Sequence, residues 1–106
     1  MYLIVFTKQA DKDKKLLKNA GLKQKAQELL NIIAVNPFQE PPSYEKLLGG
    51  LSSYYSRRIN LHHRLVYRVD ENAQQFKDDD GNLYEGIITV KRMWSHYEKL
   101  RMFFAF

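Results

Sequence analysis

The chain has 106 residues and no cysteine. It therefore has no disulfide bond and no thiolate metal ligand, which fits a reducing compartment. The apolar start at residues 1–6 is too short to span a membrane, and it lacks the basic segment and small-residue cleavage site of a signal peptide. We therefore expect residues 2–6 to form a first strand, and we expect a cytoplasmic protein with no membrane partner.

Several motifs that carry chemistry are also absent. The sequence has no Ser-His-Asp pattern, no glycine-rich phosphate loop and no His-Glu-x-x-His metal motif, and the two adjacent glycines at 49 and 50 do not make a nucleotide site. The acidic run from Asp78 to Asp80 lacks the alternating ligands and the terminal glutamate of a calcium loop. We therefore expect neither a metal nor a cofactor.

The charge of the chain is strongly positive, with a formal net charge of +5. A basic balance of this size has two readings, a solvated surface or a polyanionic partner such as nucleic acid. Lys8, Lys12 and Lys15, which share one face of a predicted helix, have the same two readings. The length fits one domain over residues 1–106.

Two helices are predicted after the first strand. Thr7 can cap a helix from about Lys8 to Asn19, and Gly21 suits the position after its end. A second helix ends at Asn36 because the residue before a proline is disfavoured in the α region. Its apolar stripe has helical spacing and consists of Leu22, Ala26, Leu29, Leu30 and Ile33.

The second half of the chain alternates like half-buried strands. In residues 64–70, Leu65, Tyr67 and Val69 point to one face, and Arg64, Val66 and Arg68 point to the other. This strand and one at about 54–59 predict an antiparallel hairpin. The long segment 71–83 contains an Asp-Gly turn signal, and a last strand follows at about 84–94. The order predicts an α+β fold, a strand, a two-helix hairpin and then antiparallel strands, in a twisted sheet with helices on one face.

The side chains that could do chemistry are Glu45, the arginines at 57, 58 and 64, the histidines at 62, 63 and 96, and the tyrosines. An acid–base pair with arginines between suits attack at a phosphodiester. A carboxylate can accept a proton from a 2′-hydroxyl, an imidazole can donate one to the departing 5′-oxygen, and guanidinium groups stabilise the phosphoryl charge. RNA supplies its own nucleophile, so the scheme requires neither a metal nor a covalent intermediate.

These residues resemble a known family. The run from Glu45-x-Leu47 through Tyr54-Tyr55-Ser56-Arg57-Arg58-Ile59 and His63-Arg64-Leu65-Val66-Tyr67, closing in His96-Tyr97, is similar to the Txe/YoeB toxins. These are ribosome-dependent mRNA interferases of the RelE/ParE superfamily. The helix stop at Asn36-Pro37-Phe38 also fits, and the resemblance covers residues 2–97.

The resemblance implies a role for each matching residue. Glu45 would be the general base, His96 the general acid and Arg64 the residue that stabilises the phosphate, with Arg58 as a further phosphate contact and Tyr97 as a wall or stacking group. It implies a toxin of a type II toxin–antitoxin system, a metal-independent endoribonuclease that cleaves mRNA in the ribosomal A site. The implied partners are mRNA on the ribosome and a YefM/Axe-type antitoxin.

Two other functions stay open. One is a ParE-like toxin of the same fold that binds DNA gyrase without nuclease chemistry, although the combination of Glu45, Arg64 and His96-Tyr97 argues against it. The other is a basic binding module that has lost its activity. The apolar tail at 98–106 could pack on the domain, pair with a second copy in a homodimer, or meet the antitoxin.

The orientation of His96 is an open point. Strict alternation from Ile88 and Val90 directs His96 towards the core, on the same side as Trp94. A β-bulge, or an end of the strand before Ser95, is needed to turn it outward. For His63, at a hairpin corner, we expect a structural role.

Overall fold

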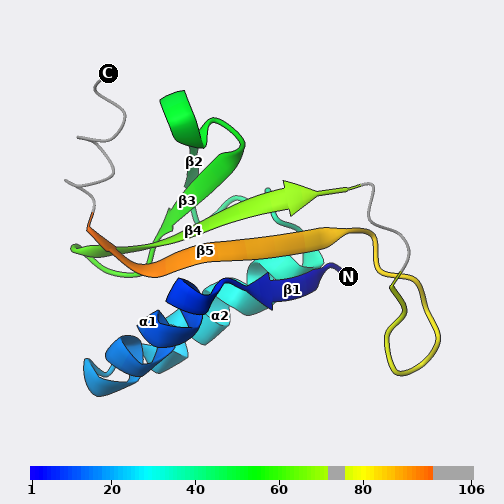
Figure 1. The fold of residues 1–106 in the computed structure, drawn as a ribbon, viewed down its shortest axis with the longest axis horizontal. Coiled ribbons are helices and arrows are strands. Elements are labelled where there is room, and N and C mark those ends of the chain that lie inside the picture. Colours follow the sequence, from blue (N-terminus) through cyan, green and yellow to red (C-terminus); the bar gives the residue numbers. More distant parts are fainter. Residues whose placement is uncertain (72–75, 97–106) are drawn as a thin grey trace.

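The computed structural model describes residues 1–71 and 76–96, with only the backbone of Ser95 and His96 (Figure 1). Tyr97, the tail at 98–106 and part of the segment 71–83 thus lie outside the described residues. The elements in chain order are β1 (Leu3–Phe6), α1 (Lys8–Asn19), α2 (Lys23–Val35), β2 (Tyr44–Lys46), the short 3₁₀ helix η1 (Gly49–Leu51), β3 (Tyr54–Arg58), β4 (His63–Asp70) and β5 (Ile87–His96).

The strands form one twisted five-stranded sheet in the order β1-β5-β4-β3-β2, and both helices lie against the same face of it (Figure 1). Neighbouring strands are antiparallel except for β1, which pairs parallel to β5. The α+β class with helices on one face is therefore confirmed. The parallel edge and the three-residue strand β2 were not predicted. A three-residue strand is too short to show alternation, and the β1–β5 pairing joins segments about 80 positions apart.

Both helices begin and end as their residues predict. The Thr7 hydroxyl accepts a hydrogen bond from the Ala10 amide at 3.1 Å, which satisfies one of the unpaired donors of the first turn of α1. Gly21 follows α1 with a φ of 73°, a conformation that favours glycine. The second helix stops at Val35, and Asn36 is extended before Pro37.

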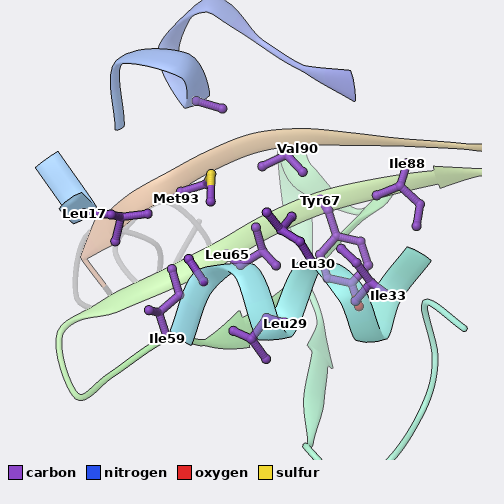
Figure 2. Packing of buried hydrophobic residues seen from close by; sticks show 12 residues of the cluster. Leu17, Leu29, Leu30, Ile33, Ile59, Leu65, Tyr67, Ile88, Val90 and Met93 are labelled. Carbon is purple, nitrogen blue, oxygen red and sulfur yellow. The ribbon is translucent and has the colours of Figure 1, made fainter. Parts of the chain in front are cut away.

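The core lies between the helices and the sheet, as Figure 2 shows for the side chains of α2 facing those of β4 and β5. Leu65 and Tyr67 of β4 are fully buried and Arg68 is exposed, as alternation predicts. The helices contribute Ala10, Leu17, Ala26, Leu29, Leu30 and Ile33 to this core, and the sheet side contributes Ile59, Leu65, Tyr67, Ile88, Val90 and Met93.

β5 is not a regular strand. Tyr67 of β4 pairs with Val90, but its neighbour Val66 pairs with Arg92, and Arg64 pairs with Ser95. The strand therefore carries one extra residue at each of two places, which is the pairing of β-bulges. As a result Met93 joins Ile88 and Val90 in the core. The sequence left open a bulge or an early end of the strand, and the structure has bulges and a strand that continues to His96. The two one-residue shifts cancel, so the backbone of His96, opposite His63, has the same register parity as Ile88 and Val90.

The described part of the segment 71–83 is a turn stabilised by its own side chains. The Asp78 carboxylate accepts hydrogen bonds from the amides of Asp80 and Asn82, each at 2.9 Å. Gly81 has a φ of 83°, and Lys77 bridges Leu83 in antiparallel fashion. The Asp-Gly turn is thus confirmed. In the described residues no helix is long and apolar enough to cross a membrane.

Candidate active site

A groove of about 710 Å³ lies at the β2–β3 side of the sheet, bounded by α2 and by the turn between β3 and β4. Three of the predicted site residues, Glu45, Arg58 and Arg64, line it. The other lining residues are Lys25, Glu28, Leu29, Ile32, Pro42, Ser43, Ile59, Asn60 and Leu61.

The register of the sheet explains why these three side chains meet. Glu45 of β2 is opposite Ser56 of β3, and Arg58, two residues further along β3, is opposite Arg64 of β4. Residues opposite each other in an antiparallel pair share a face, as do residues two apart along one strand. All of them therefore project from one face of the sheet, opposite to the face that carries the core residues Leu65 and Tyr67.

The contacts within the groove hold Arg64 in one orientation. Its Nη1 donates to the Ser56 hydroxyl at 3.1 Å, and its Nη2 lies 3.6 Å from Oε1 of Glu45. The side chain of Arg64 is 7% exposed, whereas that of Glu45 is 55% exposed. A fixed guanidinium thus lies at the floor of the groove, and a carboxylate that solvent can reach lies at its rim.

Arg58 adds a second positive charge to the same place. It is exposed, and it is the cross-strand partner of Arg64. Like charges directly opposite each other destabilise a strand pair. An anionic group bound between the two arginines would relieve this repulsion, so the arrangement favours a phosphate.

The basic surface continues along the same face of the sheet. Tyr54 is opposite Arg68, whose guanidinium carbon lies 5.8 Å from the centre of the Tyr54 ring. The Lys91 ammonium of β5 lies 5.3 Å from the same ring. An aromatic ring flanked by two cations is a surface on which a nucleotide base can stack while its phosphates are neutralised.

Arg57 does not belong to the groove, although the sequence grouped it with Arg58 and Arg64. It is fully buried on the opposite face, where Nε donates to the Tyr67 hydroxyl at 3.0 Å. Its Nη groups donate to the carbonyls of three loop residues, Pro37, Gln39 and Pro42. Arg57 thus holds the loop that leads into β2 and Glu45. Alternation with Ile59, a core residue, would have indicated this face.

Tyr67 completes the anchor of this loop. Its hydroxyl donates to the Pro37 carbonyl at 2.7 Å. Burial raises the pKa of Tyr67, and the hydrogen bond from the Arg57 guanidinium offsets this only in part. The hydroxyl therefore stays protonated and remains a donor, which agrees with the packing role expected for this tyrosine.

His63 begins β4, and His96 ends β5. The His63 ring stacks on the Trp94 ring with centroids 3.7 Å apart, which fits the structural role expected for it. The backbone of His96 is opposite His63, and that of Ser95 is opposite Arg64, so His96 is one register position from the groove. The side chain of His96 and the whole of Tyr97 lie outside what the structure describes.

Sequence reasoning missed Asp13, which is fully buried on α1. Its Oδ2 accepts hydrogen bonds from the Met93 amide at 2.9 Å, the Trp94 amide at 3.2 Å and the Arg92 Nε at 3.0 Å. Burial alone would raise the pKa of Asp13, but hydrogen bonds from Met93, Arg92 and Gln9 outweigh it, so the pKa is lowered. The spacing Ala10, Asp13, Leu17 would have placed it on the apolar face of the helix.

No three histidine, aspartate or glutamate side chains within the described residues lie close enough together to hold a metal ion.

Known proteins are similar to this chain in sequence and in fold. Residues 6–78 match a family described as YoeB-like toxin of bacterial type II toxin-antitoxin system. A protein named Toxin YoeB from Synechocystis sp. is 47% identical over 57 residues, which is 54% of this chain. The matched segment spans 59% of the length of that relative.

Solved structures extend the likeness to most of the chain. YoeB in the heterotetrameric YoeB-YefM complex from Staphylococcus aureus has a TM-score of 0.67 at 34% identity, over 92% of this chain and 99% of that one. The YoeB dimer from Staphylococcus aureus has a TM-score of 0.65 at 35% identity, over 91% and 98%.

Proposed function

This chain belongs to the YoeB-like toxins of bacterial type II toxin–antitoxin systems, and on that premise we propose that it is an endoribonuclease that cleaves mRNA on the ribosome. The observation that carries the proposal is the groove in which the Glu45 carboxylate lies against Arg64, with Arg58 opposite. A carboxylate that solvent can reach beside two guanidinium groups has the parts needed to deprotonate a hydroxyl next to a phosphate.

The reaction is an attack of the ribose 2′-hydroxyl on the adjacent phosphorus. The Glu45 carboxylate takes the proton of the 2′-hydroxyl as the new P–O2′ bond forms. The P–O5′ bond breaks, and the departing 5′-oxygen takes a proton from an acid, for which we propose the imidazolium of His96. The products are a 2′,3′-cyclic phosphate, which water can open to a 3′-phosphate, and a 5′-hydroxyl. The chemistry is complete without a metal.

The arginines stabilise the charge that develops on the phosphoryl oxygens. Arg64 is held by Ser56 and Glu45, so it does not need to reorganise when that charge appears. Arg58 is exposed and meets the phosphate from the outer side. We assign Tyr97 to the wall of the site, where its ring can stack on a base.

In this proposal His96 supplies the acid, and the ribosome contributes to the placement of the substrate. Imidazole is the side chain that titrates closest to neutral pH, which suits His96 for proton donation. Its backbone lies one register position beyond the strand partner of Arg64. Correct placement of the reacting groups supplies roughly 7–11 kcal/mol of a barrier, and the A site would provide much of it.

The partners follow from the same family. The Staphylococcus aureus relative forms a heterotetramer with YefM, and another structure of it is a dimer. For this chain we propose a YefM/Axe-type antitoxin as the inhibitor and a second copy of the chain as a further partner. A protein that acts on translating ribosomes would act in the cytoplasm.

The proposal is tested by ribosome toeprinting with the purified protein. We expect cleavage in the A site, and we expect His96→Gln to lower the cleavage rate by at least about 100-fold, since a general acid contributes about 10²–10⁴. Antitoxin binding and the circular dichroism spectrum should stay unchanged. The control is His62→Gln, which changes an exposed histidine of the β3–β4 turn and should cleave at the wild-type rate.

Full activity of His96→Gln would remove His96 from the role of acid. A supercoiling assay with DNA gyrase belongs beside the toeprint. Inhibition of the gyrase without any mRNA cleavage would favour the ParE-like function instead.

A further inference from the structure

A carboxylate of α1 is bonded to the bulged part of β5. Oδ2 of the buried Asp13 accepts hydrogen bonds from three consecutive residues, from Nε of Arg92 and from the amides of Met93 and Trp94. Arg92 pairs with Val66 between the two points where the pairing of β5 with β4 shifts, and Met93 and Trp94 lie at the second of them, before Ser95. His96 follows two positions after the last of them.

Two of these bonds come from backbone amides of the bulged segment. A bulge leaves backbone groups without ladder partners, and a buried amide without an acceptor is costly. Asp13 supplies the acceptor for two such amides. The guanidinium of Arg92 also donates through Nη2 to the Trp94 carbonyl at 3.1 Å, so Arg92 is bonded both to Asp13 and to the backbone of the bulged segment.

The start of α1 is bonded to the same strand. The Thr7 amide donates to the Val90 carbonyl at 3.1 Å, and the Thr7 hydroxyl donates to the Lys91 carbonyl at 2.8 Å. Thr7 and Asp13 together therefore contact five consecutive residues of β5. The helix sets the path of this strand over the whole bulged segment.

The path of β5 determines the register in which its last residues pair with β4. After the bulge Ser95 is opposite Arg64 and His96 is opposite His63, and the Trp94 ring stacks on His63. A slip of one residue turns every following side chain to the other face of a sheet. We propose that Asp13 is a positioning residue, whose carboxylate holds the bulge of β5 and so fixes the register in which Ser95 lies opposite Arg64 and His96 follows at the next position. The catalytic consequence rests on the proposed function, whereas the structural consequence does not.

The structural consequence has its own reporter, because Trp94 is the single tryptophan of the chain. Asp13→Asn keeps the shape of the side chain but replaces the charged carboxylate with a neutral amide. Its single oxygen is a weaker acceptor for the three donors of β5, and its NH₂ group cannot accept the hydrogen bond from Gln9. We expect this variant to keep its secondary structure by circular dichroism. We expect its tryptophan emission to move to longer wavelength and its quenching by acrylamide to rise about twofold, as for a locally opened strand.

The matched control is Asp11→Asn. Asp11 lies on the same helix and undergoes the same change of group, but it is exposed and pairs only with Lys14 in the described contacts. Its tryptophan emission and quenching should equal those of the wild type.

The catalytic consequence is measured as single-turnover mRNA cleavage on programmed ribosomes. At saturating toxin, Asp13→Asn should cleave at least about tenfold more slowly, while the toxin concentration for half-saturation stays the same, because only the transition state has lost a contact. Asp11→Asn should match the wild type in both quantities. A rate per folded molecule that equals the wild-type rate would mean that Asp13 serves stability alone, and it would overturn the proposal.

A second variant covers the case in which Asp13→Asn does not fold. Arg92→Gln changes a side chain that is 38% exposed, and it leaves Asp13 bonded to the two amides. It should move both readouts in the same direction by a smaller amount, and wild-type values in both would overturn the proposal. If the wild type cleaves no mRNA, the proposed function fails, and the tryptophan readouts still decide whether Asp13 holds the bulge.

Discussion

Arg57 and Arg58 are adjacent on β3, but they point to opposite faces of the sheet and have different roles. Arg57 points into the protein and binds the carbonyls of Pro37, Gln39 and Pro42, whereas Arg58 points to solvent at the groove. The planar fork of Arg57 serves several acceptors at once, and a lysine would supply fewer donors in a different geometry. The loop before Glu45 therefore depends on an arginine that never meets the substrate.

Lysine replacements of these two residues should separate stability from function. We expect Arg57→Lys to lower the free energy of unfolding by about 1–3 kcal/mol, since one ammonium group cannot replace the four hydrogen bonds that the guanidinium makes to Tyr67, Pro37, Gln39 and Pro42. Arg58→Lys should change it by less than about 0.5 kcal/mol, as an exposed substitution does. Urea denaturation followed by circular dichroism measures both, and equal stability of the two variants would contradict the anchoring role of Arg57.

At the scale of elements, the contact between α1 and β5 makes the fold sensitive to acid. The pKa of Asp13 is lowered in the folded protein, because the hydrogen bonds from Met93, Arg92 and Gln9 outweigh the effect of burial. A carboxyl group with a lowered folded-state pKa adds stability above its unfolded pKa, near 3.8, and loses this contribution as the pH falls through the folded value. Docking of α1 on β5 should therefore weaken in acid.

Denaturation at several pH values tests this dependence. The difference in unfolding free energy between the wild type and Asp13→Asn should be constant from about pH 7 to pH 5 and should shrink as the pH falls below about 4. The corresponding difference for Asp11→Asn should stay near zero throughout. A difference for Asp13→Asn that does not change with pH would show that Asp13 is not the group that titrates.

How far the sequence predicts these elements depends on the range of the interaction. Helix α1, with its Thr7 cap, and the alternation of Leu65 and Tyr67 are set by neighbours in the chain, so their patterns are visible in the sequence. The bulges of β5 are not, because they depend on Asp13, which lies about 80 positions earlier. The same holds for the site: the family pattern points to Glu45, Arg58 and Arg64, which line one groove, but no local signal indicates how the strand reaches His96.

Across the whole molecule, the two faces of the sheet have separate tasks. The helices cover one face (Figure 1), and the other carries Glu45, Arg58 and Arg64 and the cluster of Tyr54, Arg68 and Lys91. The net charge of +5 is thus displayed in part as a track that leads away from Arg58 and Arg64. An RNA strand that enters the groove would meet these further cations along its backbone.

The salt dependence of RNA binding tests whether these cations contact phosphates. Each phosphate contact adds about 0.7 to the slope of log affinity against log salt for a single strand, so Arg68→Gln/Lys91→Gln should reduce the slope by about 1.4. The matched control is Lys12→Gln/Lys18→Gln, two exposed lysines of α1, which should leave the slope unchanged. Fluorescence anisotropy with a labelled oligonucleotide measures it, and an equal reduction by the control would assign the phosphate contacts to the helix.

The order of the strands also bears on how this protein is made. β5 is the last strand in the described chain, yet it lies between β1 and β4 in the sheet. While β5 is still inside the ribosome, β1 lacks its neighbour β5 and Asp13 lacks its three donors. Folding dominated by such distant contacts is slow. The complete site therefore assembles only after residue 96 has left the exit tunnel, so the proposed reaction cannot begin while β5 is still being synthesised.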